Sequence, residues 1–371
     1  MIFPQEVFIL PSSTHASVPA GAGRDLSLDF LKGISMLMVV FFHNLQLNPA
    51  SVADNLFMLG ANAAVPCFFL VSGTLFFARP FDMKKHIRRC IQLYLVMVVW
   101  RILYLGFYHT LGTPVPGSLR TLLSYLLFFQ NIDGVSTSHF WFMDALLTVM
   151  LTAPVLKYCR DTNRRLILYL MALLLLFNQL LADGNLLLAI AARLIGKPAP
   201  DISQFAEISP FSLRYSNYML YYLLGAELAE RKKSISRKAA GWMACGGLLG
   251  LFVIKYLQSG TFRWQELHIT SGYYWISTML LACGSYLLVC TLPVSDCAPL
   301  SVFAKTAGTS TLGIFYLHTP LITLLTPALF YRLAPWNGWI INMAESLLIV
   351  IISCIIVWCG RRIPGIRRLL T

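Results

Sequence analysis

Charge is scarce in this sequence. Only 12% of its 371 residues are Asp, Glu, Lys or Arg, whereas 57% are hydrophobic and the mean hydropathy is +0.67. A soluble domain carries roughly a quarter charged residues, so this chain has too little polar surface to coat a water-soluble particle. Two stretches, 56–78 and 306–331, contain no charged residue at all. About 20 such residues in a helix span the apolar core of a bilayer, which predicts an integral membrane protein.

Several motifs of well-known enzymes and pumps are missing as well. The sequence has no Walker loop, no GxGxxG, no HExxH, no GxSxG and no EF-hand loop. ATP-driven transport, zinc hydrolysis and serine-hydrolase chemistry therefore have no support. The nine cysteines form no CxxC pair, and most lie in apolar stretches. This pattern predicts reduced thiols, with no disulfide framework and no metal site.

Apolar runs separated by breakers predict an all-α integral membrane protein, a single bundle of about ten transmembrane helices. The predicted spans are 31–50, 56–78, 90–110, 139–157, 165–183, 215–230, 238–257, 271–292, 306–330 and 339–360. The apolar piece 122–129 is too short to span, and we expect it at the outer interface or re-entering. The longest polar connection is 184–214, in which we expect a short interfacial helix at 186–194.

The net charge of +13 comes from basic residues grouped between the apolar runs. This is the positive-inside pattern of membrane proteins and argues against a nucleic-acid partner. The main clusters are Arg79–Arg89, Lys157–Arg165, Arg231–Lys238 and Arg361–Arg368. With ten spans, both termini fall on the basic, cytoplasmic side. Residues 1–23 lack the basic start of a signal peptide. They are predicted to form a flexible cytoplasmic tail, with an over-extended start as the alternative, and one transmembrane domain is predicted over 24–371.

Lys32 and His43 lie eleven residues apart in the first predicted span. Eleven steps of 100° end about 20° past three full turns, so both side chains point along one face, with a rise of ~16 Å. An ionisable group at such depth costs at least ~2.5–3.5 kcal/mol and usually faces a partner or a water-filled cavity. The alternative is that Lys32 is only a topology anchor and His43 an interhelical hydrogen bond.

Other ionisable groups reach a similar depth in other spans. Arg101 and His318 are each ~16 Å from the inner side, and Asp144 and Glu345 lie ~8 Å in from the outer ends of their helices. One alternative pairs Arg101 with Asp144 or Glu345; another bonds His318 to a backbone carbonyl. Two histidines and an arginine at one level are more than packing needs, which predicts a functional site.

Two weaker patterns concern small and aromatic residues. The small residues of Val71–Thr74 predict a close contact between helices. Aromatic residues near predicted helix ends are more often an interfacial belt than a sugar-binding platform. They are Trp141, Tyr215, Tyr218, Tyr221 and Tyr222.

Four blocks in order carry a resemblance to a known family. They are Lys32-Gly33 through His43, Val65–Phe77 (VPCFFLVSGTLFF), His139-Phe140-Trp141-Phe142 followed by Ala153-Pro154, and Gly308–His318 (GTSTLGIFYLH). From Asp25 to Arg362 the chain resembles the acyltransferase-3 family of integral membrane O-acyltransferases. It departs from the family pattern in having lysine at position 32, where many members have arginine, which removes bidentate phosphate contact. Asn44 and Gln46 follow His43 where an acid is often found, so the group that orients His43 stays open.

The resemblance implies an acyl-CoA donor, most often acetyl-CoA, and a hydroxyl acceptor on an extracytoplasmic glycan or lipid-linked saccharide. It also implies a multi-pass protein of the bacterial cytoplasmic (inner) membrane, surrounded by lipids and using no metal. His43 would be the general base. The candidates for the coenzyme A head are Lys32, Lys84, Arg88 and Arg89, and those for the oxyanion are Arg101, His318 and Ser72. Asp144 or Glu345 would orient an imidazole or balance Arg101.

Two other functions stay open at this point. A small-molecule transporter would favour interrupted helices in two repeated halves, and the sequence has no matched Gly or Pro breaks of that kind. A non-catalytic partner in polysaccharide export would tolerate substitution of Lys32 and His43.

Overall fold

The computed structural model describes residues 24–44, 51–198, 202, 215–259 and 272–370, and within these ranges the chain is helical, without strands. Eight helices or joined helices in this part of the chain are long and apolar enough to cross a membrane. They are α1 (Leu26–Asn44), α2–α3 (Val52–Ala61, Ala64–Phe77), α4 (Met83–Thr110), η1–α6 (Ser138–Phe140, Trp141–Thr162), α7–η2–α8 (Arg164–Leu174, Leu175–Leu180, Leu181–Leu194), α11 (Arg237–Ser259), α14–η4–α15 (Thr311–Leu325, Thr326–Phe330, Tyr331–Leu333) and α16 (Trp339–Gly360). The predicted all-α membrane protein is confirmed.

The other two predicted spans are also helices, but shorter ones. They are α10 (Ser216–Arg231), of 16 residues, and α12 (Ile276–Cys290), of 15 residues. The remaining elements are α5 (Leu119–Leu127), η3 (Gly272–Tyr274), α13 (Ala298–Thr306), η5 (Ala334–Trp336) and α17 (Pro364–Leu370). The short helix α5 covers the piece predicted to be too short to span. The predicted tail, 1–23, lies outside the described residues.

Two predicted boundaries are wrong, each for a local reason. The piece 186–194 is not a separate interfacial helix, because it continues α7 through the π-helical turn η2. A single glycine at 184 costs a helix only ~1 kcal/mol, too little to end it. The ninth span begins at Thr311 instead of 306, because the chain breaks at Gly308. A Cβ on Gly308 would lie 2.0 Å from the Asp29 carbonyl oxygen, so α1 passes directly against this break.

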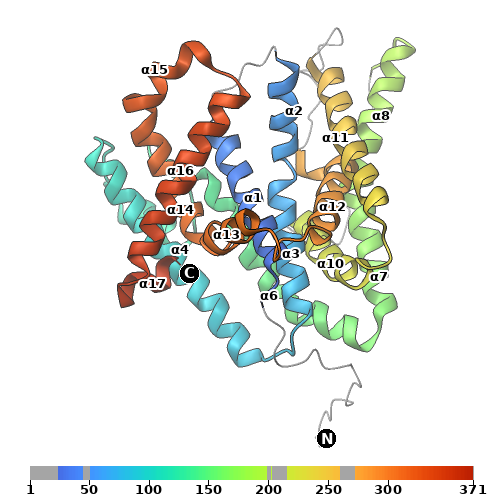
Figure 1. The fold of residues 1–371 in the computed structure, drawn as a ribbon, viewed down its shortest axis with the longest axis horizontal. Helices are drawn as coiled ribbons and strands as arrows, with labels where there is room; N and C mark the ends of the chain where they lie inside the picture. Colours follow the sequence, from blue (N-terminus) through green and yellow to red (C-terminus); the bar gives the residue numbers. More distant parts are fainter. Residues whose placement is uncertain (1–23, 45–50, 199–201, 203–214, 260–271, 371) are drawn as a thin grey trace, which may run out of the picture.

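The helices form two groups on either side of α1, α2 and α3 (Figure 1). One hydrophobic core joins α3, α6, α7, α10, α11 and α12, and a second joins α1, α4, α14 and α16. Helix α1 packs against α3 on one side and against α13, α14 and α16 on the other. Residues on α1 therefore lie inside the bundle, between its two cores.

Helices α3 and α10 cross at two glycines. A Cβ on Gly73 would lie 1.8 Å from the Tyr222 carbonyl oxygen, and one on Gly225 would lie 2.0 Å from that of Leu70. The Thr74 hydroxyl crosses the same contact and donates to the Gly225 carbonyl at 2.8 Å. Only glycine allows backbones this close, and the close contact predicted for Val71–Thr74 is confirmed.

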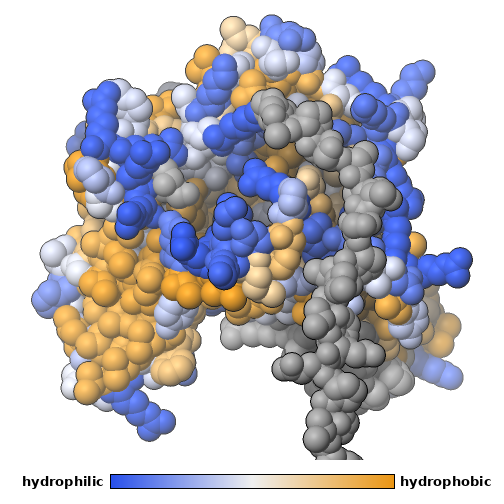
Figure 2. Space-filling view, turned by 90° about the horizontal axis from the view of Figure 1, so that it is seen from below, coloured by the Kyte–Doolittle hydropathy of each residue, from blue (hydrophilic) through white to orange (hydrophobic). Residues whose placement is uncertain are grey.

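One end of the bundle carries the α6–α7 turn and the start of α4, at the bottom of Figure 1. Figure 2 views this end and shows hydrophilic residues gathered across its middle, beside a broad hydrophobic area. An ion network ties the turn to α10: Arg160 and Arg164 both bind Glu227 and Glu230, with Arg160 Nε 3.3 Å from Glu227 Oε1 and Arg164 Nη2 2.9 Å from Glu230 Oε2.

Candidate active site

A cavity of about 700 Å³ lies between the two halves of the bundle, with walls from α1, α3, α6, α10, η3 and α14. Pockets of about 300–1,000 Å³ are the size that holds small molecules. Lys32 and His43 both line it, and the common face predicted for these two residues is confirmed. Ser72 of α3, a predicted oxyanion donor, also lies on its wall, as does Thr311 of α14.

Helix α1 presents one continuous stripe to the cavity. Lys32, Met36, Val39 and His43 line it at spacings of four, three and four residues. These are the spacings that place side chains above one another on one helix face. The charged group and the imidazole are thus the two ends of a stripe that is otherwise apolar.

Lys32 is held at its end of the stripe by a neighbouring acid. Its Nζ lies 2.7 Å from Asp29 Oδ1, and the Asp29 carboxylate, whose side chain is only 5% exposed, also accepts from Arg24. The i, i+3 spacing of Asp29 and Lys32 is a pattern that sequence reasoning could have used and missed. Among the described residues that line the cavity, Lys32 is the one Lys, Arg, Asp or Glu.

The other basic residues predicted to hold a coenzyme A head lie elsewhere. Lys84, Arg88 and Arg89 are exposed at the start of α4 and do not line the cavity. The start of α4 lies at the end of the bundle that is at the bottom of Figure 1. The structure therefore brings only Lys32 of these four residues to the cavity.

Three histidines from three elements meet at the other end of the α1 stripe. The ring centroids of His43 and His318 are 5.2 Å apart, those of His43 and His139 6.1 Å, and those of His139 and His318 4.9 Å. His43 and His139 line the cavity, and His318 is fully buried behind them. The proximity of His43 and His318 agrees with their predicted common depth. His139 belongs to the third sequence block that carries the family resemblance, but no role was predicted for it.

The hydrogen bonds of His318 define its tautomer. Its Nδ1 lies 2.6 Å from the Phe315 carbonyl oxygen, which can only accept, so Nδ1 carries a proton. Its Nε2 lies 3.2 Å from the hydroxyl of Thr319. Both ring nitrogens of His318 therefore have partners within the protein. The bond to the Phe315 carbonyl is the one expected from the alternative in which His318 binds a backbone carbonyl. This geometry gives no support to His318 as an oxyanion donor.

Arg101 is buried in a different setting, with 1% of its surface exposed. Its Nη2 donates to the Phe129 carbonyl at 2.7 Å, and its guanidinium lies 4.5 Å from the centre of the Tyr125 ring. The Tyr125 hydroxyl in turn donates to the Arg101 carbonyl at 3.0 Å. Arg101 does not line the cavity; it fastens α5 and the segment after it to α4. This placement favours a structural role.

The two predicted acids also lie outside the cavity wall. Glu345 of α16 accepts a hydrogen bond from Asn44 Nδ2 at 2.7 Å, and Asn342 donates to the Phe41 carbonyl at 2.9 Å. Carbonyls in the last turn of a helix lack intrahelical partners, so these bonds fix the turn of α1 that carries His43. Asp144 is half-buried in the first turn of α6, where the helix dipole favours an acid.

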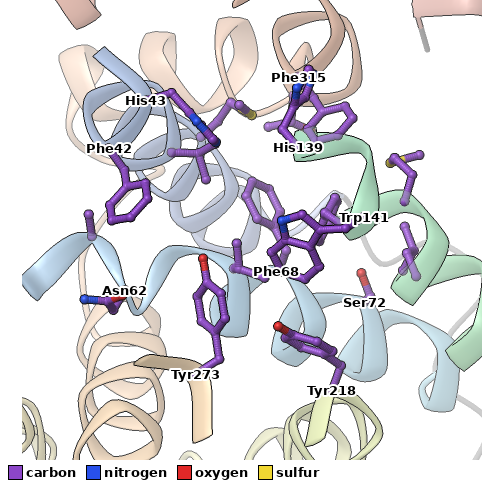
Figure 3. Close-up of a pocket in the computed structure, with 18 of the residues that line it drawn as sticks. Phe42, His43, Asn62, Phe68, Ser72, His139, Trp141, Tyr218, Tyr273 and Phe315 are labelled. Carbon is purple, nitrogen blue, oxygen red and sulfur yellow. The ribbon is translucent and has the colours of Figure 1, made fainter. Parts of the chain in front are cut away.

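Aromatic rings form the wall that faces the histidines (Figure 3). The centroid of Trp141 is 5.4 Å from that of Tyr218 and 5.5 Å from that of Tyr273, and the two tyrosine rings are 6.0 Å apart. The predicted interfacial belt is wrong here: Trp141, Tyr215 and Tyr218 line the cavity, and Tyr221 and Tyr222 are fully buried. A belt and a cavity wall both place aromatic residues near helix ends, and the sequence does not separate them.

The remaining chemistry of the described residues is simple. They contain no group of three or more His, Cys, Asp or Glu that could hold a metal ion. All nine cysteines are free thiols.

The helical bundle is that of a multi-pass membrane protein, and its internal cavity is lined by a lysine, two histidines and a serine that can take part in chemistry. The sequence model described as "Acyltransferase domain" matches residues 25–359. The chain therefore belongs to the acyltransferase-3 family and is a membrane acyltransferase. A search of curated proteins and a search of solved structures found no match.

Proposed function

We propose that this acyltransferase transfers an acyl group, acetyl in the first instance, from cytoplasmic acyl-CoA to a hydroxyl of an extracytoplasmic glycan or lipid-linked saccharide. One observation carries the proposal: Lys32 and His43 lie at opposite ends of one face of α1 and line the same cavity. The rise between them is ~16 Å, a length that the thin pantetheine arm can thread. The acyl-CoA donor and the glycan acceptor come from the family resemblance.

The donor would enter beside Lys32. Lysine offers a compact positive charge that can meet a phosphate oxygen of coenzyme A, without the bidentate geometry of arginine. The exposed Lys84, Arg88 and Arg89 raise the local concentration of an anionic substrate at the membrane face. In this account they steer the donor, and Lys32 holds it.

The reaction would take place at His43. The acceptor hydroxyl oxygen attacks the thioester carbonyl carbon, the C–S bond breaks, and the hydroxyl proton passes through His43 to the leaving sulfur. Such a base contributes roughly 10²–10⁴-fold to the rate. Ser72, on the cavity wall, is the predicted oxyanion donor that the cavity geometry supports.

The acceptor would lie against Trp141, Tyr218 and Tyr273. Flat rings with hydroxyl groups at their edges suit a sugar, whose ring C–H groups pack on aromatic faces and whose hydroxyls form hydrogen bonds. No Lys, Arg, Asp or Glu lines this part of the described cavity, which favours a neutral sugar unit. The motif blocks also resemble those of the O-acetyltransferase that modifies enterobacterial common antigen, and this resemblance is one hypothesis for the acceptor.

The proposal includes a topology. Helices α10 and α12 would complete a bundle of ten spans in the bacterial inner membrane, with both termini in the cytoplasm. The clusters Arg79–Arg89, Lys157–Arg165 and Arg231–Lys238 support this orientation, because cytoplasmic loops are enriched in Lys and Arg. The Lys32 end of the cavity would then face the cytoplasm and the donor.

The test is mass spectrometry of envelope glycans from cells that lack the chain, carry it, or carry one of two variants. Wild type should add the mass of one acyl group to a glycan, His43→Ala should not, and His109→Ala should behave as wild type. His109 is the matched control because it is an exposed histidine at the end of α4. Identical glycans with and without the wild-type chain would overturn the proposal, and full acylation by His43→Ala would remove His43 from it.

A further inference from the structure

The cavity has a second aromatic wall, which differs in chemistry from the first. It consists of three phenylalanines, Phe68 of α3, Phe142 of α6 and Phe315 of α14, and all three line the cavity. The ring centroids of Phe68 and Phe142 are 5.6 Å apart, and those of Phe142 and Phe315 are also 5.6 Å apart. The three rings form one continuous row across three helices, which we call the phenylalanine row.

The phenylalanine row reaches from the histidines to the predicted oxyanion donor. At one end, the Phe315 centroid is 5.3 Å from that of His139, which in turn is 6.1 Å from that of His43, and Figure 3 shows Phe315 beside His139. At the other end, Phe68 lies four residues before Ser72, and both line the cavity. Residues four apart lie above one another on one helix face. The row therefore borders the place where the thioester would react.

Two neighbouring residues of α6 supply one ring to each aromatic wall. Trp141 packs with Tyr218 and Tyr273, at centroid distances of 5.4 Å and 5.5 Å, and the edges of these rings carry N–H and O–H groups. Phe142 packs within the phenylalanine row, whose rings have no hydrogen-bonding group. Successive residues of a helix point about 100° apart, so the two side chains face different parts of the cavity. One wall can bond the hydroxyls of a sugar, and the other offers apolar contact alone.

The described residues place no fixed charge on the wall beside the phenylalanine row. Lys32, the one Lys, Arg, Asp or Glu among the described lining residues, is ~16 Å from His43 along α1. The Arg101 guanidinium is 5.6 Å from the ring of Phe140, which lies 6.0 Å from that of Phe315, and Arg101 does not line the cavity. A carboxylate bound against the row would therefore be desolvated without a cation to pair with it, which costs free energy.

We propose that the phenylalanine row binds the acyl group of the donor and restricts it to short, uncharged chains, from acetyl to butyryl. The inference rests on the proposed function, in which the thioester carbonyl lies between His43 and Ser72. From that carbonyl carbon, the sulfur leads back along the pantetheine arm toward Lys32, and the acceptor hydroxyl arrives from the side of Trp141. The acyl chain then points toward the remaining wall, which is the phenylalanine row.

A charged acyl group would also interfere with the general base. A carboxylate close to His43 would stabilise the protonated imidazole, and a protonated ring has no free nitrogen to take the hydroxyl proton. Succinyl and butyryl groups separate this effect from chain length. Both have four carbons, and they differ at the last one, which is a carboxylate in succinyl and a methyl in butyryl.

Competing donors test the inference on the full-length protein in lipid, with the glycan fraction from cells lacking the chain. We expect kcat/KM for butyryl-CoA to exceed that for succinyl-CoA by about 100-fold, the scale of an unpaired buried charge. Displacement of bound tritiated acetyl-CoA makes the same comparison without transfer, and butyryl-CoA should act at the lower concentration. Equal use or equal displacement by the two donors would overturn the inference. The expected order of displacement without any transfer by wild type refutes the proposed function instead.

Substitutions at two neighbouring positions locate the discrimination. Phe142→Ala should raise kcat/KM for butyryl-CoA relative to acetyl-CoA by ~10-fold, because it makes room for two more methylenes. Phe142→Lys should raise succinyl-CoA relative to butyryl-CoA by ~10-fold, because its cation can bind the carboxylate. Trp141→Ala, from the other wall, should leave both ratios as in wild type.

Each ratio compares two donors on one preparation, so it does not depend on how much of a variant is folded. Unchanged ratios in both Phe142 variants would place the acyl group elsewhere in the cavity and overturn the inference. The same shift in chain-length preference in Trp141→Ala would also overturn it, because the two walls would then not divide acyl group and acceptor between them.

Discussion

Arg101 and His43 reach the same depth in their helices, yet their surroundings differ completely. The Arg101 guanidinium is enclosed, donates to the Phe129 carbonyl and lies against the Tyr125 ring. His43 is half-buried on the wall of a cavity, beside two further imidazoles. Arg101 is held by its Nη2 hydrogen bond and by ring contacts, while its Nε and Nη1 are buried without a hydrogen-bond partner. A group enclosed in this way holds neighbouring segments together, whereas a group that faces a cavity is available for chemistry. Depth in the membrane predicts the free-energy cost of inserting an ionisable residue. The neighbouring side chains decide whether that residue has a structural or a chemical role.

The largest effect on acyl transfer is expected at His43, the residue of this pair that faces the cavity. His43→Ala should lower kcat for acyl transfer by ~10²–10⁴-fold, the contribution of a general base. The unfolding temperature should stay near that of wild type, because the side chain is half-buried beside a cavity. Both quantities are measured on the same purified protein. A loss of kcat below about threefold would place His43 with Arg101 as a structural group.

Arg101→Met should act mainly on stability. Losing hydrogen bonds from a buried cation typically costs about 1.5–3 kcal/mol, and the lost ring contact adds to it. The unfolding midpoint should fall, which thermal denaturation followed by a thiol-reactive dye would report. Arg120→Met on α5 is the control, because Arg120 is exposed. A variant that unfolds like wild type but has lost acyl transfer would contradict the assignment and move Arg101 into the chemistry.

Lys32→Gln should raise the KM for acetyl-CoA by about tenfold, ~1.4 kcal/mol, and change kcat little. The reason is that its charge would contact a substrate anion remote from the reacting atoms. Initial rates over a range of acetyl-CoA concentrations measure this, at low and at high salt. Lys84→Gln, from the exposed cluster, should give a smaller rise that disappears at high salt. Equal increases in the KM for acetyl-CoA in both variants would show that Lys32 contributes no more to donor binding than the exposed Lys84.

Trp141→Ala should raise the KM for the glycan acceptor by ~3–10-fold, since an aromatic contact of this kind is worth about 0.5–1.5 kcal/mol. The KM for acetyl-CoA should not change, because the ring lies away from Lys32. Trp242→Ala is the matched control, with 78% of its surface exposed on α11. A change confined to the donor would reverse the assignment of the two ends of the cavity.

The sequence predicted what lies along one helix better than what lies between helices. Lys32 and His43 are on the same helix, so its 100° periodicity alone fixed their common face. Arg101 could be placed in depth, but not in direction, because neighbouring helices decide what it meets. The carbonyl that binds it, at Phe129, belongs to an irregular segment with no sequence signal.

The site residues that the sequence did not predict, His139 and Tyr273, also owe their positions to packing between helices. His139 precedes its helix in a short 3₁₀ turn, and its place beside His318 depends on how α6 and α14 pack. Tyr273 reaches the aromatic wall from the turn η3, and Trp141 from the first turn of α6. A hydropathy pattern predicts that such rings lie near a helix end. It does not say whether the end meets lipid or a cavity.

The most direct test of the account is photo-crosslinking with an acyl-CoA whose acyl chain carries a diazirine, read out by peptide mass spectrometry on the full-length protein. We expect the label on the cavity wall, in the α1 segment that ends at His43 or in α3 near Ser72, and competition by acetyl-CoA. A competed label found only on the surface of α4, around Lys84–Arg89, would contradict the claim that one cavity joins Lys32 to His43 and receives the thioester.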